Sequence, residues 1–169
     1  MGCDCCDKLK HEHNRVSKKD RFLMLLMVLI LAAIFLRPFV VMQNMNRGDS
    51  FLNYGFYNRA ILQYRKAALL SSNENSAYSW LGYTYNKIGD KDKAMTSYEK
   101  AIEIDSTDNA VNFELGNIYY RSYQDGDGED FYEKAIKCFE RILENDPSNK
   151  NAKLMLDSLN RKSRVKGNG

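Results

Sequence analysis

Five residues with metal-binding side chains lie close together near the N-terminus. They are Cys3, Cys5, Cys6, His11 and His13. Thiolates and imidazoles at such short separations can ligate zinc or another thiophilic metal. Structural zinc sites, however, use two separated ligand pairs, whereas this cluster is terminal and irregular. We therefore interpret the segment as an unstructured basic tail. A metal- or redox-responsive membrane sensor that uses the cluster is the alternative function.

The acidic stretch QDGDGED at 124–130 is a second candidate for metal chemistry. The calcium loop of an EF-hand needs glycine at its sixth position and an acidic residue at its twelfth. Counted from Asp125, these positions hold Asp130 and Ile136, so the stretch does not fit the pattern. We expect a solvated loop here, and we expect the protein to use no cofactor.

The sequence lacks the residues that common catalytic sites require. No histidine follows His13, so Ser-His or Cys-His nucleophilic machinery has no base there. No glycine-rich phosphate loop precedes a Lys-Ser or Lys-Thr pair. Residues 48–160 carry 13 Lys and Arg against 18 Asp and Glu, so a basic nucleic-acid footprint is missing. These observations predict that the protein is not an enzyme and does not bind nucleic acid.

The elements that would position binding residues recur along the chain with a fixed period. Gly48, Gly82 and Gly116 lie 34 residues apart, and Ala60 and Ala94 have the same spacing. A fixed period of this length predicts a stacked array of helix hairpins, and such arrays usually bind other chains. Further pairs at this spacing are Tyr64 with Tyr98 and Ala67 with Ala101.

The pattern resembles the tetratricopeptide repeat, whose signature is a Leu-Gly pair followed by an aromatic residue, Ala, an aromatic residue, Ala and Pro. The middle unit, Tyr78 to Ser106, matches almost throughout, and the resemblance covers about residues 42–160. The third unit carries seven extra residues between Tyr119 and Ala135. The resemblance implies an all-α fold of three helix hairpins and a C-terminal capping helix, arranged as a right-handed superhelical solenoid.

The recurring glycines have a steric interpretation. Small residues at the landmark positions let the first helix of each hairpin approach its neighbour closely. Three residues after each landmark we expect an aromatic ring to fill the remaining space, namely Phe51, Tyr85 or Tyr119. Gly55 and Gly89 lie where the first helices must end, which predicts a positive φ angle at both.

The resemblance also implies a concave groove lined by the first helix of each hairpin. Lys87 and Arg121 would hold a carboxylate of an extended peptide, and amides would pair with its main chain. For any one of these residues the competing interpretation is a solvated helix face. We expect Trp80 to serve in packing, with a contact to the partner as the alternative. The predicted groove residues are Asp49, Asn53, Tyr83, Asn86, Lys87, Asn117, Tyr120 and Arg121.

Family members that bind chaperone tails grip a terminal carboxylate with a particular set of Lys, Asn and Arg residues. This chain has other residue types at the matching positions, so the sequence disfavours a receptor of that kind. The residues are Met45, Asp49, Trp80, Ala110 and Glu114.

Residues 22–36 form an uninterrupted apolar run, which continues beyond Arg37-Pro38 to Met42. The 21 residues would span about 31 Å as a helix, enough for a bilayer core of about 30 Å. A cleaved secretory signal is the main alternative, but residues 37–47 contain no Ala, Gly or Ser for a cleavage site. A buried core helix would show a polar stripe, which this run lacks. Because Arg47 replaces the leucine before Gly48, the first helix of the array can run on from this segment.

Basic residues around the apolar run predict its orientation. Six Lys and Arg residues precede it within 8–21, whereas Arg37 and Arg47 are the only two in its downstream flank. We therefore expect a cytoplasmic N-terminus and an exported array. An array on the cytoplasmic face is the alternative.

The sequence thus predicts a polar tail at 1–21, a transmembrane helix at 22–42, a repeat domain at 43–160 and a basic disordered tail at 161–169. The predicted function is a non-catalytic, membrane-anchored scaffold or adaptor that binds a protein or peptide. Assembly or secretion of envelope proteins is the expected process.

Overall fold

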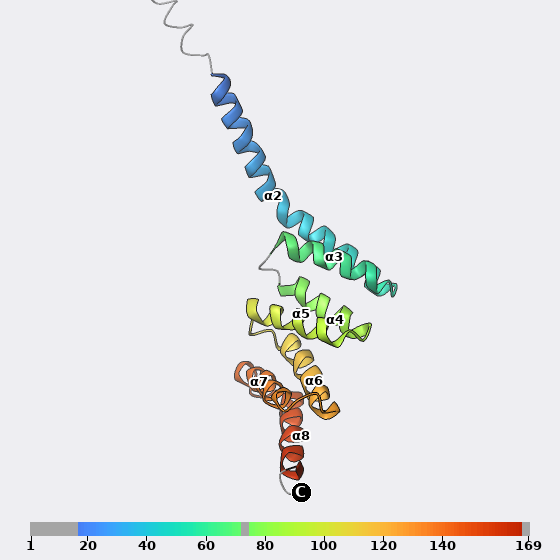
Figure 1. Cartoon of the computed structure of the whole chain (residues 1–169). Coiled ribbons are helices and arrows are strands. Elements are labelled where there is room, and N and C mark those ends of the chain that lie inside the picture. The colour runs from blue at the N-terminus through green and yellow to red at the C-terminus, as the bar shows by residue number, and fades with distance from the viewer. Residues whose placement is uncertain (1–16, 72–74, 167–169) are drawn as a thin grey trace, which may run out of the picture. The chain divides into compact units, whose positions relative to one another are not determined.

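The structure is a computed structural model that describes residues 17–71 and 75–166, with side chains up to Arg161. The described part of the chain consists of helices joined by short turns, which confirms the all-α prediction (Figure 1). The N-terminal cysteines and histidines lie outside the described residues. The helices are α2 (Lys18–Asn53), α3 (Tyr57–Leu70), α4 (Asn75–Lys87), α5 (Lys91–Ile104), α6 (Asn109–Asp125), α7 (Asp130–Asn145) and α8 (Lys150–Lys166).

The chain divides into two compact units, residues 1–39 and residues 40–169. The described part of the first unit is the apolar portion of α2, whose large side chains are exposed; Phe35, for example, has 75% of its surface exposed. By length and composition, α2 is the one candidate membrane span among the described residues. A signal sequence near the N-terminus would have the same features. The helix continues through Pro38 to Asn53, so the first helix of the array does run on from the apolar segment.

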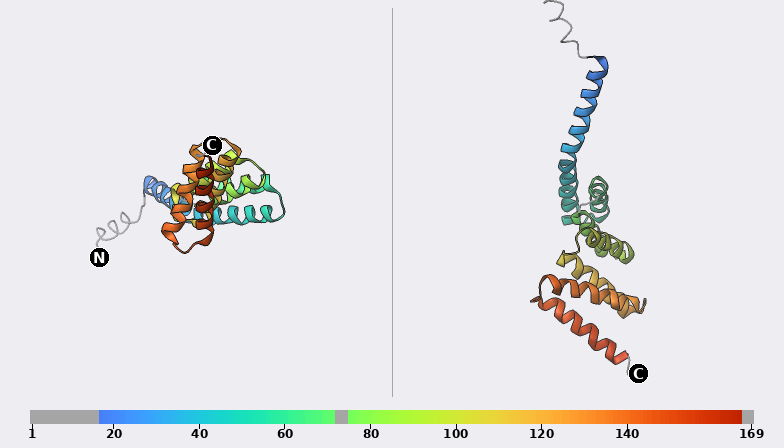
Figure 2. Two further views of the ribbon diagram at one scale, coloured as in Figure 1. Left: turned by 90° about the horizontal axis from the view of Figure 1, so that it is seen from below. Right: turned by 90° about the vertical axis from the view of Figure 1, so that its left-hand side faces the viewer.

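The second unit is built from helix hairpins (Figures 1 and 2), and the two helices of each hairpin meet at a landmark glycine. A Cβ atom added at Gly82 would lie 2.6 Å from Tyr98 Cδ1, and one at Gly116 would lie 2.9 Å from Phe139 Cζ. At Gly48 the added atom would overlap the ring of Tyr64. Each glycine therefore forms a notch that holds an aromatic ring from the second helix of its own hairpin.

This packing corrects the predicted partner of each landmark glycine. Phe51, Tyr85 and Tyr119 were expected to fill the space beside the glycines, but that space belongs to rings 16 to 23 residues downstream. The reason is geometric, because the space in front of each glycine Cα is occupied by a ring from the facing helix, and a residue three positions along lies beside the glycine on its own helix. Phe51 and Tyr85 are half-buried and pack against the core clusters instead.

The core of the array consists of two clusters of buried side chains. The first belongs to residues 41–85 and the second to residues 78–159, and Tyr78 and Tyr85 of α4 pack against both. Adjacent hairpins thus share side chains, so the described repeats stack as a continuous array. The other main contacts between helices join neighbours along the chain, as expected for a solenoid.

Local signals at the helix ends explain where the helices begin and end. Gly55 and Gly89 have φ angles of 75° and 81°, which confirms the predicted left-handed turns. Asp108 caps α6, because its carboxylate accepts hydrogen bonds from the main-chain N–H groups of Ala110 and Val111. The sharp ends keep the second helix of each hairpin antiparallel to the first.

The third hairpin departs from the predicted loop at 124–130. Compared with the second hairpin, four of the seven extra residues lengthen α6, one lengthens the turn, and two lengthen the start of α7. Gly126, with a φ angle of 85°, ends α6 in the left-handed conformation. Lys91 Nζ lies 3.0 Å from Asp125 Oδ2 and 3.4 Å from Asp127 Oδ2, so a lysine of α5 holds the acidic stretch.

The C-terminal end also differs from the prediction. The expected capping helix is present as α8, and it continues to Lys166, where a disordered basic tail was predicted from residue 161. Arg and Lys favour helices, and no Gly or Pro interrupts the chain before Gly167. The helix therefore extends through the basic residues.

Candidate functional site

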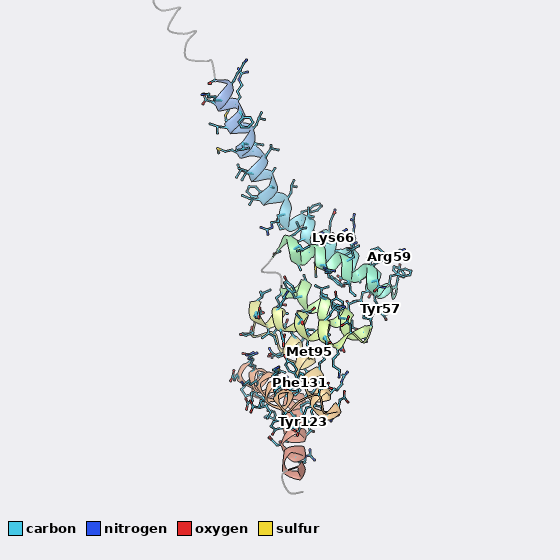
Figure 3. All side chains as sticks on the ribbon, in the orientation of Figure 1. Tyr57, Arg59, Lys66, Met95, Tyr123 and Phe131 are labelled. Atoms are coloured by element: carbon cyan, nitrogen blue, oxygen red, sulfur yellow. The ribbon has the colours of Figure 1, made fainter. Side chains whose placement is uncertain are left out.

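Two hollows lie on the face of the array formed by the first helices of the hairpins. We call the first the proximal hollow; it has a volume of about 600 Å³ and draws residues from α2, α3 and α4. Figure 3 labels Tyr57, its contribution from the first turn of α3. The residues that line the proximal hollow are Asp49, Leu52, Asn53, Tyr57, Trp80, Tyr83 and Lys87.

Trp80 forms the boundary of the proximal hollow and has 39% of its surface exposed. Its ring stacks on that of Tyr64, with centroids 6.2 Å apart and an interplanar angle of 15°. It meets the Tyr83 ring edge to face at 5.6 Å. The expectation that Trp80 serves in packing therefore covers part of its role, because one side of the ring faces the hollow.

A partly buried hydrogen bond fixes the acidic group of the proximal hollow. Tyr64, which is fully buried in the notch of Gly48, donates a hydrogen bond of 2.7 Å from its hydroxyl to Asp49 Oδ1. Burial, followed by the hydrogen bond to Asp49, raises the pKa of Tyr64 above its ordinary value. The hydroxyl thus stays protonated and holds the carboxylate in place.

The opposite side of the proximal hollow carries positive charge. Lys87 Nζ lies 5.1 Å from the centroid of the Tyr83 ring, a favourable cation–π geometry. Lys87 forms no ion pair with any residue in the described ranges, so its ammonium group is available to a ligand. The hollow therefore offers a carboxylate, an ammonium group, an amide and three aromatic rings.

We call the second the distal hollow; it has a volume of about 440 Å³ and lies between α4 and α6. Tyr98 of α5 contributes to its floor, and Trp80 and Tyr83 line both hollows. The residues that line the distal hollow are Asn75, Ser76, Ser79, Trp80, Tyr83, Tyr98, Asp108, Ala110, Val111 and Glu114.

The structure brings four of the eight predicted groove residues together in the proximal hollow. They are Asp49, Asn53, Tyr83 and Lys87.

The other four predicted residues line neither hollow. Arg121 is exposed near the end of α6, Asn86 and Asn117 are half-buried, and Tyr120 packs against the second core cluster. Lys87 and Arg121 are thus not joined in one hollow, and the pair expected to hold a carboxylate stays a prediction.

Sequence reasoning missed several residues of the two hollows, among them Tyr57, Tyr98 and Glu114. The 34-residue period contained a usable signal, because Glu114 occupies in the third repeat the position that Trp80 occupies in the second. Tyr98 was noted only as a recurring aromatic position, since the pattern does not show whether such a ring lines a surface hollow. No pattern marks Tyr57, which precedes the recurring alanine of its helix by three residues.

Among the described residues, no group of three or more His, Cys, Asp or Glu side chains is arranged to hold a metal ion. Cys138, the cysteine in this part of the chain, is buried in α7, and burial raises the pKa of its thiol to about 11. A buried thiol in that state is protonated at neutral pH and is a poor nucleophile.

Comparison with known proteins agrees with the geometry. Residues 76–108 match a family model described as a tetratricopeptide repeat. This segment contains α4 and α5, the hairpin between the two hollows. The comparison of curated protein sequences gave no match.

Solved structures of the same fold extend over most of the chain. The tetratricopeptide repeat (TPR) domain of Arabidopsis OM64 has a TM-score of 0.63 at 18% identity, covering 75% of this chain and 98% of the other. The first TPR of Spaghetti (RPAP3), bound to the HSP90 peptide SRMEEVD, has a TM-score of 0.63 at 18% identity, covering 73% and 93%. The second TPR domain of human RPAP3, in complex with the HSP70 peptide SGPTIEEVD, has a TM-score of 0.62 at 22% identity, covering 73% and 98%. The array therefore has the fold of a TPR domain.

Proposed function

We propose that this protein is a non-catalytic scaffold or adaptor that binds a protein or peptide in the groove formed by the two hollows. The observation that carries the proposal is the proximal hollow, in which three helices present charged, amide and aromatic groups without an occupant from the described chain. Structures of similar fold contain bound peptides, which supports the same general role here. The composition of the hollow suits an extended chain, because both main-chain and side-chain groups find partners.

We further propose that the apolar part of α2 anchors the protein in a membrane. Its large apolar side chains are exposed along the first unit, and a soluble protein has no reason to expose so many in succession. The basic residues before the span favour a cytoplasmic N-terminus and an exported array. A tethered adaptor with this topology would act in the assembly or secretion of envelope proteins.

Site-specific photo-crosslinking in intact membranes tests the groove. Replacing Tyr83 with p-benzoylphenylalanine in the full chain places a reactive group of similar shape in both hollows. We expect irradiation to join a defined partner to this variant, identified by mass spectrometry. The matched control carries the same residue at Lys137, which is exposed on α7 and lines neither hollow. Equal crosslinking from both positions would contradict the groove assignment.

The topology needs its own experiment. Fusion of alkaline phosphatase after Gly169 should give an active enzyme if the array is exported, because this reporter folds only outside the reducing cytoplasm. A fluorescent protein that folds in the cytoplasm is the complementary reporter. If only the fluorescent fusion is active, the array faces the cytoplasm. The envelope role would then be wrong, and the proposal that the groove binds a peptide or protein would be unaffected.

A further inference from the structure

The floor of the distal hollow contains a hydroxyl group without a partner. Tyr98 has 2% of its surface exposed, and its ring is held in the notch of Gly82. Its hydroxyl oxygen forms no hydrogen bond within the described part of the chain. Buried hydroxyl groups are nearly always paired, because an unpaired one loses its hydrogen bonds to water without replacement. The Tyr98 side chain lines the distal hollow, while its oxygen is itself covered, so a ligand reaches that oxygen when a neighbouring side chain shifts.

The first and third repeats show why the second is unusual. In the first repeat, the equivalent ring of Tyr64 donates its hydroxyl proton to Asp49. In the second, the position of Asp49 is occupied by Tyr83, so Tyr98 has no carboxylate from its own repeat. In the third, the ring belongs to Phe139, which has no hydroxyl group. The second repeat thus keeps the polar group and lacks its internal partner.

The charge of the distal hollow restricts the kind of group that fits. Glu114 and Asp108 line it, and no Lys or Arg does. Glu114 is half-buried and forms no ion pair with the residues that the structure describes. Burial, and next the negative charge of Glu114, raise the pKa of Tyr98, so the hydroxyl stays neutral and keeps its lone pairs as acceptors. Trp80 and Tyr83 add two aromatic rings, which attract cations.

We propose that the distal hollow is a subsite for a lysine or arginine side chain of the bound peptide. The cationic group would pair with Glu114, donate a hydrogen bond to the Tyr98 oxygen and lie against the ring of Trp80 or Tyr83. A carboxylate would meet the repulsion of Glu114 and Asp108, and an apolar side chain would leave the hydroxyl unpaired and the carboxylate desolvated. This inference rests on the proposed function, because it specifies what the groove selects.

Selection from a random peptide library tests the specificity. The full chain is held in phosphatidylcholine nanodiscs, whose neutral lipid does not attract basic peptides. Selected peptides are synthesised and titrated against the protein with Trp80 fluorescence as the signal, since Trp80 is the single tryptophan and lines both hollows. We expect Lys or Arg at one fixed position, and we expect replacement of a selected arginine by its neutral isostere citrulline to weaken binding about tenfold or more.

Variants then assign the effect to the distal hollow. Glu114→Gln should weaken binding of the arginine peptide about tenfold and leave binding of the citrulline peptide nearly unchanged. Tyr98→Phe keeps the ring in the Gly82 notch and should weaken the arginine peptide several-fold. Glu140→Gln, which removes one exposed charge on α7 outside both hollows, is the matched control and should have no effect.

The possible failures are distinguishable. Selected peptides with acidic or apolar residues at every fixed position would overturn the inference and keep the proposed function. An equal effect of Glu114→Gln on the arginine and citrulline peptides, or an effect of Glu140→Gln as large as that of Glu114→Gln, would also overturn it. If no peptide is selected and crosslinking from position 83 finds no partner, the proposed function fails as well.

Discussion

At the scale of single residues, each landmark glycine and its aromatic ring form one packing unit. The ring lies where the glycine has no side chain, and the added Cβ distances show that no room is left. Interiors of this density do not absorb an extra methyl group without displacing neighbours. The stability of each hairpin therefore depends on the absence of a single carbon atom.

We predict that Gly82→Ala destabilises the protein despite the better helix propensity of alanine. The new methyl group would lie 2.6 Å from the buried Tyr98 ring. Overpacking costs about 1–3 kcal/mol, whereas the helix propensity recovers about 1 kcal/mol. Urea unfolding followed by Trp80 fluorescence should show a net loss of about 1 kcal/mol, the middle of the difference between these two terms. Gly116→Ala should lower the stability less, because the nearest contact of its added methyl group is 2.9 Å. If Gly82→Ala left the stability unchanged, the notch would be contradicted.

Removal of one oxygen atom should have opposite effects in the first two repeats. Tyr64→Phe breaks the hydrogen bond to Asp49 and should cost about 1–2 kcal/mol of unfolding free energy. Tyr98→Phe removes an unpaired buried hydroxyl and should leave the stability unchanged or raise it by up to about 1 kcal/mol. The two variants serve as controls for each other, because both keep the ring. An equal loss in both would mean that Tyr98 has a partner in solution.

At the scale of helices, the third hairpin shows how an insertion can be accommodated without disturbing the stack. The extra residues extend α6 and α7 beyond the length of their counterparts, while the notch between Gly116 and Phe139 keeps its place. Gly126 then ends α6 with a φ angle of 85°, and main-chain N–H groups at the end of the helix bond back to its last turn. This cap decides where the extension stops.

We predict that Gly126→Ala destabilises the protein by about 1 kcal/mol, because an L residue is strained in the left-handed conformation. The matched control is Gly128→Ala, two residues later in the same turn. Gly128 is not in the left-handed region, and the added methyl group would meet the movable end of the Asp130 side chain and make an ordinary contact with Phe131. Urea unfolding of the two variants and the parent chain gives the comparison. A larger loss for Gly128→Ala would contradict the role of the cap.

The sequence was sufficient for those parts of the fold that depend on local patterns. The 34-residue spacing predicted the hairpins, and Gly55 and Gly89 predicted the turns, because close approach and positive φ each demand a particular residue type. The extension of α6 was not predictable from composition, since Lys91 of another helix holds its acidic end. The distal hollow was likewise missed, because Glu114 and Tyr98 meet only after two hairpins have stacked.

At the scale of the whole array, three buried tyrosines link its stability to alkaline pH. Burial is the main cause that raises the pKa values of Tyr64, Tyr98 and Tyr119, and Asp49, Glu114 and Glu99 contribute through their negative charge or hydrogen bonds. The three rings belong to three different repeats. Their titration therefore acts on the array as a unit and not on one hairpin.

From neutral pH upwards, we predict that the array loses stability above about pH 9, where the thiol of Cys138 contributes, and more steeply above about pH 10. Above this pH the tyrosines of the unfolded chain lose their protons, whereas the folded ones, with raised pKa values, retain them, so unfolding releases protons. Each such tyrosine contributes a slope of about 1.4 kcal/mol per pH unit. Urea unfolding at pH 8–11, followed by circular dichroism, measures this slope. Tyr98→Phe should reduce it, and an unchanged slope would contradict the assignment.

The aromatic rings held in the glycine notches also separate two properties that one side chain often controls together, namely the spacing of the helices and the polar group that the side chain presents. The carbon atoms of Tyr64, Tyr98 and Phe139 fix the spacing of the helices, while the single para substituent is bonded internally, left open or absent. Exchange between tyrosine and phenylalanine at these positions thus keeps the ring in its notch, and at Tyr98, which lines the distal hollow, it changes the group offered to a ligand. The ligand specificity of the array can therefore be changed by adding or removing a single oxygen atom.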